Sequence, residues 1–357
     1  MLYFRKSMPE TRLDNRPLLG RIDQDLFIPP AILPALTAAA NRRLNVLMLG
    51  APGSGKTTLL RAIVAMADDA EFPSVFVDLN PAKDAAQALS LIADALGRQW
   101  SGFGDSLAKE RTLATQAGEY LERMGPMGDP LRWRVLPEES ETGRLLRLTR
   151  QLGRAPASRL VIDSPPGQGE AFTLFGRLRD ELWQLGHQWI LAADEIMRDE
   201  FTRPPANAFF DVQLDLTPLS ESEQREFYER RLASDPEVDV DALVGKTDGL
   251  PRSLLELARS VVLDGGNVDE VLARRNEIQA RLERLPPAAA RVMAYLADHG
   301  ATSGSDKRLL ATLGVSGQRA RQVLRELEAD GLVRSFPEQQ ERQGRPRKLY
   351  ELDEARR

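Results

Sequence analysis

The sequence predicts an α/β fold: a parallel sheet with helices on both faces, followed by an α-helical region and a small basic domain. Short apolar runs alternate with helical segments between residues 41 and 216, which is typical of a parallel sheet covered on both faces. From residue 217 to about residue 284 the pattern becomes purely helical. The 357 residues, 42% of them hydrophobic, are enough for two or three separate cores.

These patterns predict four parts in chain order. Residues 1–40 form an N-terminal lead-in, 41–216 the sheet domain, 217–284 a helical lid and 285–357 the C-terminal domain. Residues 98–140 are the least regular part of the sheet domain. They contain a helical pattern near residues 107–123 and then a cluster of helix-breaking residues, so we expect an insertion there.

Composition excludes several classes of protein. The sequence has no cysteine, which excludes disulfides and cysteine-bound metals and fits a reducing compartment. No apolar run reaches the roughly 18 residues that a membrane-spanning helix needs, and the apolar stretch at the start is too short for a secretory signal. We therefore expect a cytoplasmic protein without a membrane partner.

The elements of the sheet domain follow from hydrophobic periodicity. Strands are expected at residues 46–49, 74–80, 159–163, 188–194 and 209–216. Helices are expected at residues 29–43, 56–69, 82–97 and 170–186. We expect Gly97 to close the third of these helices in the left-handed conformation that favours glycine.

A glycine-rich turn links the first strand to the helix that follows it. The stretch "LMLGAPGSGKTTLL" matches the pattern G-x-x-x-x-G-K-[ST], and both its strand and its helix are predicted around it. Backbone N–H groups of such a loop surround a β-phosphate, Lys56 reaches the β- and γ-phosphate oxygens, and the Thr57 hydroxyl coordinates Mg²⁺. The residues expected to hold ATP are Gly50, Ala51, Pro52, Gly53, Ser54, Gly55, Lys56, Thr57 and Thr58. The sequence thus predicts a P-loop NTPase sheet with ATP and Mg²⁺ as cofactors.

Two strands end in an acid that can serve the metal. Chain order favours Asp163 as the Mg²⁺-side acid and the end of the following strand as a position that senses the γ-phosphate. The local sequence favours Asp194–Glu195, because this pair would supply a metal-side aspartate and a water-activating glutamate together. Both assignments stay open at this point.

The choice decides how hydrolysis would occur. If Asp163 is the metal-side acid, the next position holds Ser164, which is a poor base. Hydrolysis would then depend on Glu170, Glu195 or a neighbouring subunit, and it would be slow or dependent on a partner. We therefore expect an ATPase that binds nucleotide and whose turnover is slow or depends on a partner.

The C-terminal domain is the basic part of a chain whose formal net charge is −5. From Lys307 to Lys348 there are ten Lys or Arg residues against five acids. One helix ends near Gly314, Ser316 is a plausible N-cap, and a second helix runs to Gly331. Ala320, Val323, Leu324 and Leu327 form its apolar face, and the opposite face carries Gln318, Arg321, Gln322 and Arg325.

Two short strands, "LVRSF" and "KLYEL", follow this helix and flank a loop. The loop carries Arg342, Arg345 and Arg347, as in the wing of a winged-helix domain. The side chains of the second helix suit base edges and phosphates in a major groove, which predicts binding to duplex DNA. The alternative is a domain that docks a partner protein or a second copy of the chain.

Together these segments resemble the AAA+ ATPases of the origin-recognition and helicase-loader clade, and they are also similar to the STAND signalling ATPases. The resemblance covers roughly residues 16–285. The segments that carry it are "LLGRID" (18–23), the phosphate loop, the two acidic strand ends, "LTPLSESEQREFYERRL" (216–232) and "TDGLPRSLLELARSVV" (247–262).

This resemblance implies roles for several residues. Arg252 would reach the γ-phosphate from the start of a lid helix, and Gly20–Arg21 would lie near the adenine. A neighbouring subunit would supply a further arginine, for which Arg198 and Arg203 are candidates, so a self-oligomer is expected. The sequence departs from the family at Ser164, where an acid is usual, and at Asp194, where a neutral polar residue is typical.

The leading hypothesis is an AAA+ ATPase in which nucleotide state controls DNA binding or assembly, in replication initiation, helicase loading, transposition or defence. The alternative is a STAND-like nucleotide-gated signalling switch or transcription regulator, in which the C-terminal domain docks a partner. A large C-terminal sensor array would favour that alternative, and none follows the predicted wing. A metabolic phosphotransferase would leave the basic domain unexplained.

Overall fold

The computed structural model describes residues 13–14, 16–18, 23–67, 69–124, 140–164, 169–233, 235, 237–264, 268–283, 285–306, 309–310, 314, 316–337 and 348–352. The chain divides into two compact units, residues 1–259 and residues 260–357. None of the helices in these described ranges has the length and hydrophobicity that crossing a bilayer requires.

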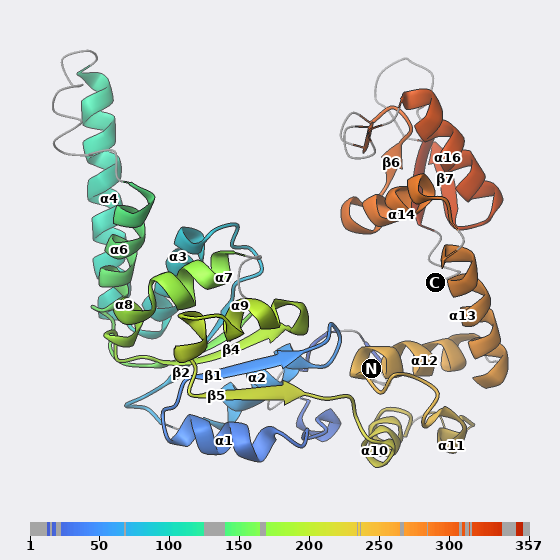
Figure 1. Cartoon of the computed structure of the whole chain (residues 1–357), viewed down its shortest axis with the longest axis horizontal. Coiled ribbons are helices and arrows are strands. Elements are labelled where there is room, and N and C mark those ends of the chain that lie inside the picture. The colour runs from blue at the N-terminus through green and yellow to red at the C-terminus, as the bar shows by residue number, and fades with distance from the viewer. Residues whose placement is uncertain are drawn as a thin grey trace, which may run out of the picture. The chain divides into compact units, whose positions relative to one another are not determined.

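The first unit is built on a five-stranded parallel sheet (Figure 1). Its strands are β1 (Val46–Gly50), β2 (Ser74–Asp78), β3 (Arg159–Asp163), β4 (Gln188–Asp194) and β5 (Val212–Leu216). They lie in the order β2-β3-β4-β1-β5, and every neighbouring pair is parallel. This confirms the predicted parallel sheet. The loop after β1 therefore opens beside the end of β4, with the end of β3 one strand further away.

Side chains alternate along the buried strands, so the sheet has a core on each face. Leu47 and Leu49 of β1 pack on one face, and Val46 and Met48 pack on the other. The first face is covered by α3 (Ala85–Gln99), α6 (Glu141–Leu152) and α8 (Arg179–Trp183), and the second by α1 (Leu33–Asn41) and α2 (Lys56–Met66). Figure 1 shows α1 on the opposite side of the sheet from α3 and α6, as the sequence predicts.

The segment expected to be an insertion contains a long helix, α4 (Ser101–Arg123), which packs against α3. The prediction that Gly97 ends α3 in a left-handed conformation is wrong, because Gly97 lies inside the helix and has no positive φ. A Cβ at Gly104 would lie 2.5 Å from the Gly97 carbonyl oxygen. The two glycines are there because the backbones of α3 and α4 approach too closely for side chains.

The predicted continuous helix at residues 170–186 is also wrong. It is divided into α7 (Glu170–Phe172), a π-helical segment (Thr173–Arg177) and α8. The wider turn brings Phe175 into an aromatic cluster, with ring centroids 5.2–6.1 Å from Trp189, Phe201, Phe209 and Phe210. Helical periodicity alone does not reveal a π-helical turn, because the segment is only five residues long and the residues on either side keep the helical period.

The helical lid follows β5 and begins with a strongly capped helix. The Ser220 hydroxyl accepts a hydrogen bond from the Glu223 N–H, and the Glu223 carboxylate accepts one from the Ser220 N–H. The helices of this region are α10 (Glu221–Arg231), α11 (Val240–Leu243) and α12 (Pro251–Asp264). Shorter elements of the first unit are η1 (Gln24–Leu26), η4 (Glu195–Met197), α9 (Arg198–Thr202) and η5 (Ala206–Ala208).

The second unit pairs helices with a small antiparallel sheet. Its described elements are α13 (Val268–Glu283), α14 (Pro287–His299), β6 (Thr302–Ser303), α16 (Gly317–Ala329), β7 (Val333–Pro337) and β8 (Lys348–Leu352). The strands lie in the order β6-β8-β7, and the two that the sequence predicts are β7 and β8. The helix expected before Gly314 and the loop between β7 and β8 lie largely outside the described residues.

Candidate functional site

The glycine-rich turn between β1 and α2 has a backbone that glycine alone adopts easily. Gly53 and Gly55 have φ values of +83° and +92°. A Cβ on Gly53 would also lie 2.8 Å from the Cβ of Arg252, so the loop and the lid helix approach here without a side chain between them. The Ser54 hydroxyl is buried and has no hydrogen-bond partner among the described residues. A buried hydroxyl of this kind fits a loop that receives a polar ligand.

Lys56 is the first residue of α2, and its ammonium points back into the loop that precedes the helix. Its ammonium donates to the carbonyl oxygens of Gly50, at 2.7 Å, and Ala51, at 2.9 Å. Burial lowers the pKa of Lys56, and the nearby carboxylates of Asp194, Asp163 and Glu195 oppose that shift. The ammonium and the N-terminus of α2 together provide a positive potential where phosphates would bind.

Thr57 and Asp163 meet beside this loop. The Thr57 hydroxyl donates to the Asp163 carboxylate at 2.5 Å, and Asp163 is only 4% exposed. Burial raises the pKa of Asp163, and the hydrogen bond from Thr57 opposes that shift. Of the two acids left open by the sequence, Asp163 is the one beside the P-loop threonine.

This pair of oxygen ligands fits Mg²⁺. The described residues contain no group of three or more His, Cys, Asp or Glu that could hold a metal without other ligands. Magnesium is usually bound through one or two protein oxygens together with substrate phosphates and water, which is what a hydroxyl and a carboxylate beside a phosphate loop provide. Thr57 and Asp163 would therefore be the metal ligands.

A cavity of about 420 Å³ lies over the loop and is lined by residues from four strand ends and the lid. Its charged lining residues are Arg16, Lys56, Asp163, Asp194 and Arg252. Arg252 lies at the start of α12, and its N–H donates to the Gly53 carbonyl oxygen at 3.2 Å. The structure thus brings Arg252 beside the phosphate loop, where the resemblance expects it.

The other acidic candidates are arranged differently. Glu195 is exposed and does not line the cavity. The Glu170 carboxylate accepts from the Ala85 N–H at 2.9 Å, so it caps the start of α3. Ser164 lines the cavity and has a φ of +54°, which is rare for a residue with a side chain. Of the pair Asp194–Glu195, it is Asp194 that lines the cavity.

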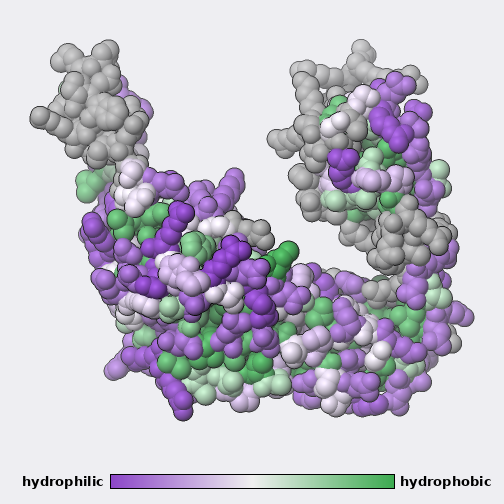
Figure 2. All heavy atoms as spheres, in the orientation of Figure 1, coloured by the Kyte–Doolittle hydropathy of each residue, from purple (hydrophilic) through white to green (hydrophobic). Residues whose placement is uncertain are grey.

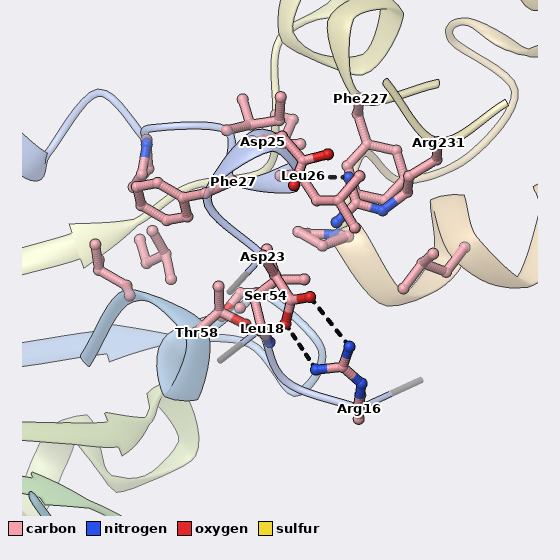
Figure 3. A pocket seen from close by; sticks show the side chains of 18 of the residues that line it. Arg16, Leu18, Asp23, Asp25, Leu26, Phe27, Ser54, Thr58, Phe227 and Arg231 are labelled. Carbon is pink, nitrogen blue, oxygen red and sulfur yellow. Dashed lines mark hydrogen bonds and ion pairs between the residues drawn. The ribbon is translucent and has the colours of Figure 1, made fainter. Parts of the chain in front are cut away.

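A second cavity, of about 160 Å³, adjoins the first (Figure 3). The two share Arg16, Gly55, Thr58, Pro251 and Leu255 as lining residues. The second is also lined by the N-terminal segment around residues 23–28 and by the lid helix α10. Because it combines apolar and polar walls next to the phosphate loop, it suits a nucleotide base and ribose.

The walls of this second cavity depend on arginines. Arg16 makes two hydrogen bonds to the Asp23 carboxylate, at 2.6 and 3.0 Å, which Figure 3 shows as dashed lines. Arg231 of α10 is 6% exposed, donates to the Leu26 carbonyl oxygen at 3.0 Å and lies over the Phe227 ring. Burial lowers the pKa of Arg231 to about 10. These contacts fasten the lid to the N-terminal segment within the first unit.

The sequence did not single out Arg16, Asp23 or Arg231, although each lies in a segment that carried the family resemblance or next to one. Spacing could not identify Arg231, because its partner is distant in sequence: Arg231 and Leu26 are 205 residues apart. Arg16 and Asp23 are only seven residues apart, but no predicted helix or strand contains them. Arg21, expected near the adenine, lies outside the described residues.

The two arginines considered for a neighbouring subunit differ in their contacts. Arg198 donates to the Asp215 carboxylate at 2.7 Å within the same chain. Arg203 is exposed and lies just before the cis peptide bond between Pro204 and Pro205. A role for either in a second subunit stays a prediction.

In the second unit, α16 has the two faces that the sequence predicts. Ala320, Val323, Leu324 and Leu327 are buried, and the Ser316 hydroxyl caps the helix by accepting from the Arg319 N–H at 3.3 Å. The exposed face carries Gln318, Arg319, Arg321, Gln322, Arg325 and Glu326. Figure 2 shows hydrophilic residues over the part of this unit where α16 lies. Arg342, Arg345 and Arg347 lie outside the described residues.

No protein-family model matches the chain, and no curated protein matches it in sequence. Among solved structures it is similar to Cdc6p of Pyrobaculum aerophilum, with 13% identity, a TM-score of 0.50, and coverage of 97% of this chain and 94% of that one. It is also similar to the Orc1 protein of Aeropyrum pernix in complex with DNA, with 21% identity, a TM-score of 0.45, and coverage of 96% and 92%. The RuvB Holliday junction branch migration motor of Thermotoga maritima has 17% identity, a TM-score of 0.39, and coverage of 88% and 94%.

The similarity to Cdc6p extends over nearly the whole length of both chains. At this level of identity it shows the fold. The parallel sheet with β1 between β4 and β5, the glycine-rich loop and the helical segment after β5 agree with it. The chain therefore has the fold found in Cdc6p, with a P-loop sheet followed by helices.

Proposed function

We propose that this protein binds ATP and Mg²⁺ between the sheet and the lid, hydrolyses ATP, and uses its nucleotide state to control how it binds duplex DNA or assembles. The observation that carries the nucleotide part is the meeting of Thr57 and Asp163 at 2.5 Å beside Lys56 and the glycine-rich loop. Two residues 106 positions apart in the sequence are brought together where a metal–phosphate complex needs its protein oxygens.

The lid supplies the coupling in this proposal. Arg252 lines the phosphate cavity, and Arg231 lines the adjoining one, so both parts of a nucleotide would contact lid helices. A change from ATP to ADP removes one phosphate and its charge from the side of Arg252. The lid would then hold the closed arrangement less tightly. The same change would alter any assembly that depends on the lid.

The second unit supplies the DNA contacts. Its α16 exposes three arginines, two glutamines and one acid, Glu326, on one face, and its opposite face is fixed in the core by four apolar side chains. A rigid helix with such a face suits a major groove, where Gln and Arg side chains can contact base edges and phosphates. This fits DNA better than a docked protein, because nothing apolar lies at the exposed positions of the helix between Gln318 and Arg325.

The proposal is tested by titrating a DNA duplex with the full chain in ATP, in ADP and without nucleotide, while the oligomeric state is followed by light scattering. We expect the three conditions to differ in DNA affinity or in assembly. Replacing Lys56 with Ala is expected to lower ATP affinity about 100-fold, because a charge-assisted contact to the phosphates is lost. It should also remove the difference between the three conditions. Lys83→Ala, at an exposed lysine of the same unit, serves as the control.

The DNA-binding face is tested separately with Arg325→Ala. This change is expected to lower duplex affinity about tenfold and to reduce the slope of log affinity against log salt by about one. Arg291→Ala removes the same charge from an exposed position of α14 in the same unit and should change neither quantity appreciably. Equal losses in the two variants would show that net charge, and not the face of α16, determines binding. A chain ending at Leu285 is expected to lose most of its duplex affinity at moderate salt.

A further inference from the structure

The phosphate cavity receives two carboxylates from neighbouring strands. Asp163 ends β3 and Asp194 ends β4, and both line the cavity. In the register of these strands, Asp163 lies opposite Ala192, two residues before Asp194. Side chains two residues apart on a strand point to the same face, so Asp163 and Asp194 both face the side on which α2 begins. Two acids are thus directed at one phosphate-binding loop.

The two acids differ in the hydrogen bonds that their carboxylates accept. Asp163 is bonded to the Thr57 hydroxyl, and this contact places it beside the metal ligand. Asp194 accepts one hydrogen bond, from the Ile196 N–H to Oδ1 at 3.1 Å. Within the part of the chain that the structure describes, its Oδ2 atom accepts none. The hydrogen bond from the Ile196 N–H holds the Asp194 side chain in place and leaves Oδ2 for another donor.

The other candidates for activating water do not fit this position. Ser164 has a hydroxyl, which is a poor base. Glu170 caps α3 through the Ala85 N–H, and Glu200 accepts from the Gly169 N–H at 3.0 Å. Glu195 is exposed and outside the cavity. Asp194 is therefore the available carboxylate among the described residues that line the cavity.

We propose that Asp194, at the end of β4, orients and deprotonates the water that attacks the γ-phosphate. This inference rests on the proposed ATPase function and identifies its base. The position is electrostatically reasonable because Lys56, Arg252 and Arg16 line the same cavity and offset the negative charge.

In the proposed step, Oδ2 of Asp194 accepts a proton from water while the water oxygen forms a bond to the γ-phosphorus. The bond between the γ-phosphorus and the β–γ bridging oxygen breaks, and the bridging oxygen leaves on ADP with the electron pair. The products are ADP and inorganic phosphate, and the proton on Asp194 returns to solvent or to the phosphate. The ammonium of Lys56 and the guanidinium of Arg252 would neutralise charge on the phosphate oxygens.

The inference is tested with Asp194→Asn, which keeps the size of the side chain and its ability to accept from the Ile196 N–H. We expect ATP turnover by the full chain, with Mg²⁺ and duplex DNA present, to fall about 100-fold or more. The Kd for a fluorescent ATP analogue should stay within about threefold, which also shows that the variant is folded. The matched control is Asp199→Asn, the same change at an exposed carboxylate of α9 that does not line the cavity, which should leave turnover within about twofold of the unmodified chain.

A second measurement does not depend on turnover. ADP with aluminium fluoride mimics the transition state and ADP with beryllium fluoride the ground state, so Asp194→Asn should weaken binding of the first complex at least tenfold more than that of the second. Asp194 is the wrong residue if the Asn variant keeps both its turnover and its preference for the aluminium complex, or if Asp199→Asn loses as much. A chain that binds ATP and responds to it in DNA binding, but does not turn it over, also overturns this inference. It leaves the nucleotide-controlled DNA binding intact.

Discussion

The two units of the protein hold their candidate functional side chains in opposite ways. In the first unit, Asp163 is 4% exposed and bonded to Thr57, and Lys56 bonds to the loop around it. In the second unit, Arg321 and Gln322 are exposed, and the hydrogen bonds recorded for them go to residues of their own helix, Gly317 and Glu326. Chemistry on a phosphate needs fixed distances, whereas contact with a DNA backbone tolerates side chains that adjust.

This difference has a consequence for mutations. A change inside the first unit should alter stability or the positions of catalytic groups, because its side chains have many neighbours. A change on the exposed face of α16 should alter affinity with little effect on folding.

Phe175→Ala should produce the largest effect on stability. Phe175 is 1% exposed and contacts four aromatic rings, so its removal is expected to cost about 3–5 kcal/mol of the free energy of unfolding. Chemical denaturation followed by far-UV circular dichroism measures the change. Tyr120→Ala, at a side chain that is 64% exposed, should stay within about 0.5 kcal/mol. Similar losses in the two variants would contradict the idea that this aromatic cluster holds the sheet unit together.

Asp163→Asn should lower function without lowering stability. We expect ATP turnover to fall about 100-fold, because the variant loses the full negative charge beside the proposed metal. In the absence of Mg²⁺ the free energy of unfolding should not decrease, because burial already disfavours the charged form of Asp163 and an Asn can still accept from Thr57.

The control for this change is Asp78→Asn. Asp78 lies opposite Asp163 in the sheet but does not line the phosphate cavity. ATP turnover by the Asp78→Asn variant should therefore stay within about threefold of the unmodified chain. If both variants lost turnover to the same degree, the acid at the end of β3 would have no special relation to the loop.

Ser316→Ala should have the smallest effect of the three. It removes the cap that the Ser316 hydroxyl provides at the start of α16, at an expected cost of about 1 kcal/mol to the second unit. Ser316→Asn keeps a capping oxygen and should cost less. At temperatures where the variant is folded, DNA affinity should change less than about threefold, since the exposed face of the helix is unaltered. A tenfold loss of affinity would show that the start of α16 itself contacts DNA.

Much of the fold could be predicted because it depends on local patterns. The alternation of apolar runs located the five strands, and the spacing of glycines located the phosphate loop. The predictions failed where one element adapts to another. Gly97 looks like a helix end in the sequence, but it lies inside α3 because α4 passes over it. The division of residues 170–186 likewise follows from the packing of Phe175 and not from its periodicity.

The sequence likewise predicted some residues of the candidate site and not others. Lys56 and Thr57 follow from a contiguous motif, but the sequence left Asp163 and Asp194–Glu195 as alternatives for the metal-side acid. Glu170 was a reasonable candidate for a base until the structure placed its carboxylate on the Ala85 N–H. Arg16 and Arg231 were not foreseen, because each contributes to a cavity wall through partners that no spacing rule identifies.

The sequence by itself determined the parallel sheet, the phosphate loop and the two-faced helix α16, because each is encoded by neighbouring residues with a fixed period or spacing. Only the tertiary structure decided which acid meets Thr57 and which acid remains for another role. That decision depends on the order of the strands, which places β3 and β4 beside the loop although their residues are separated from it by more than a hundred positions. Distances of this kind are set by packing across the whole sheet, and no local pattern contains them.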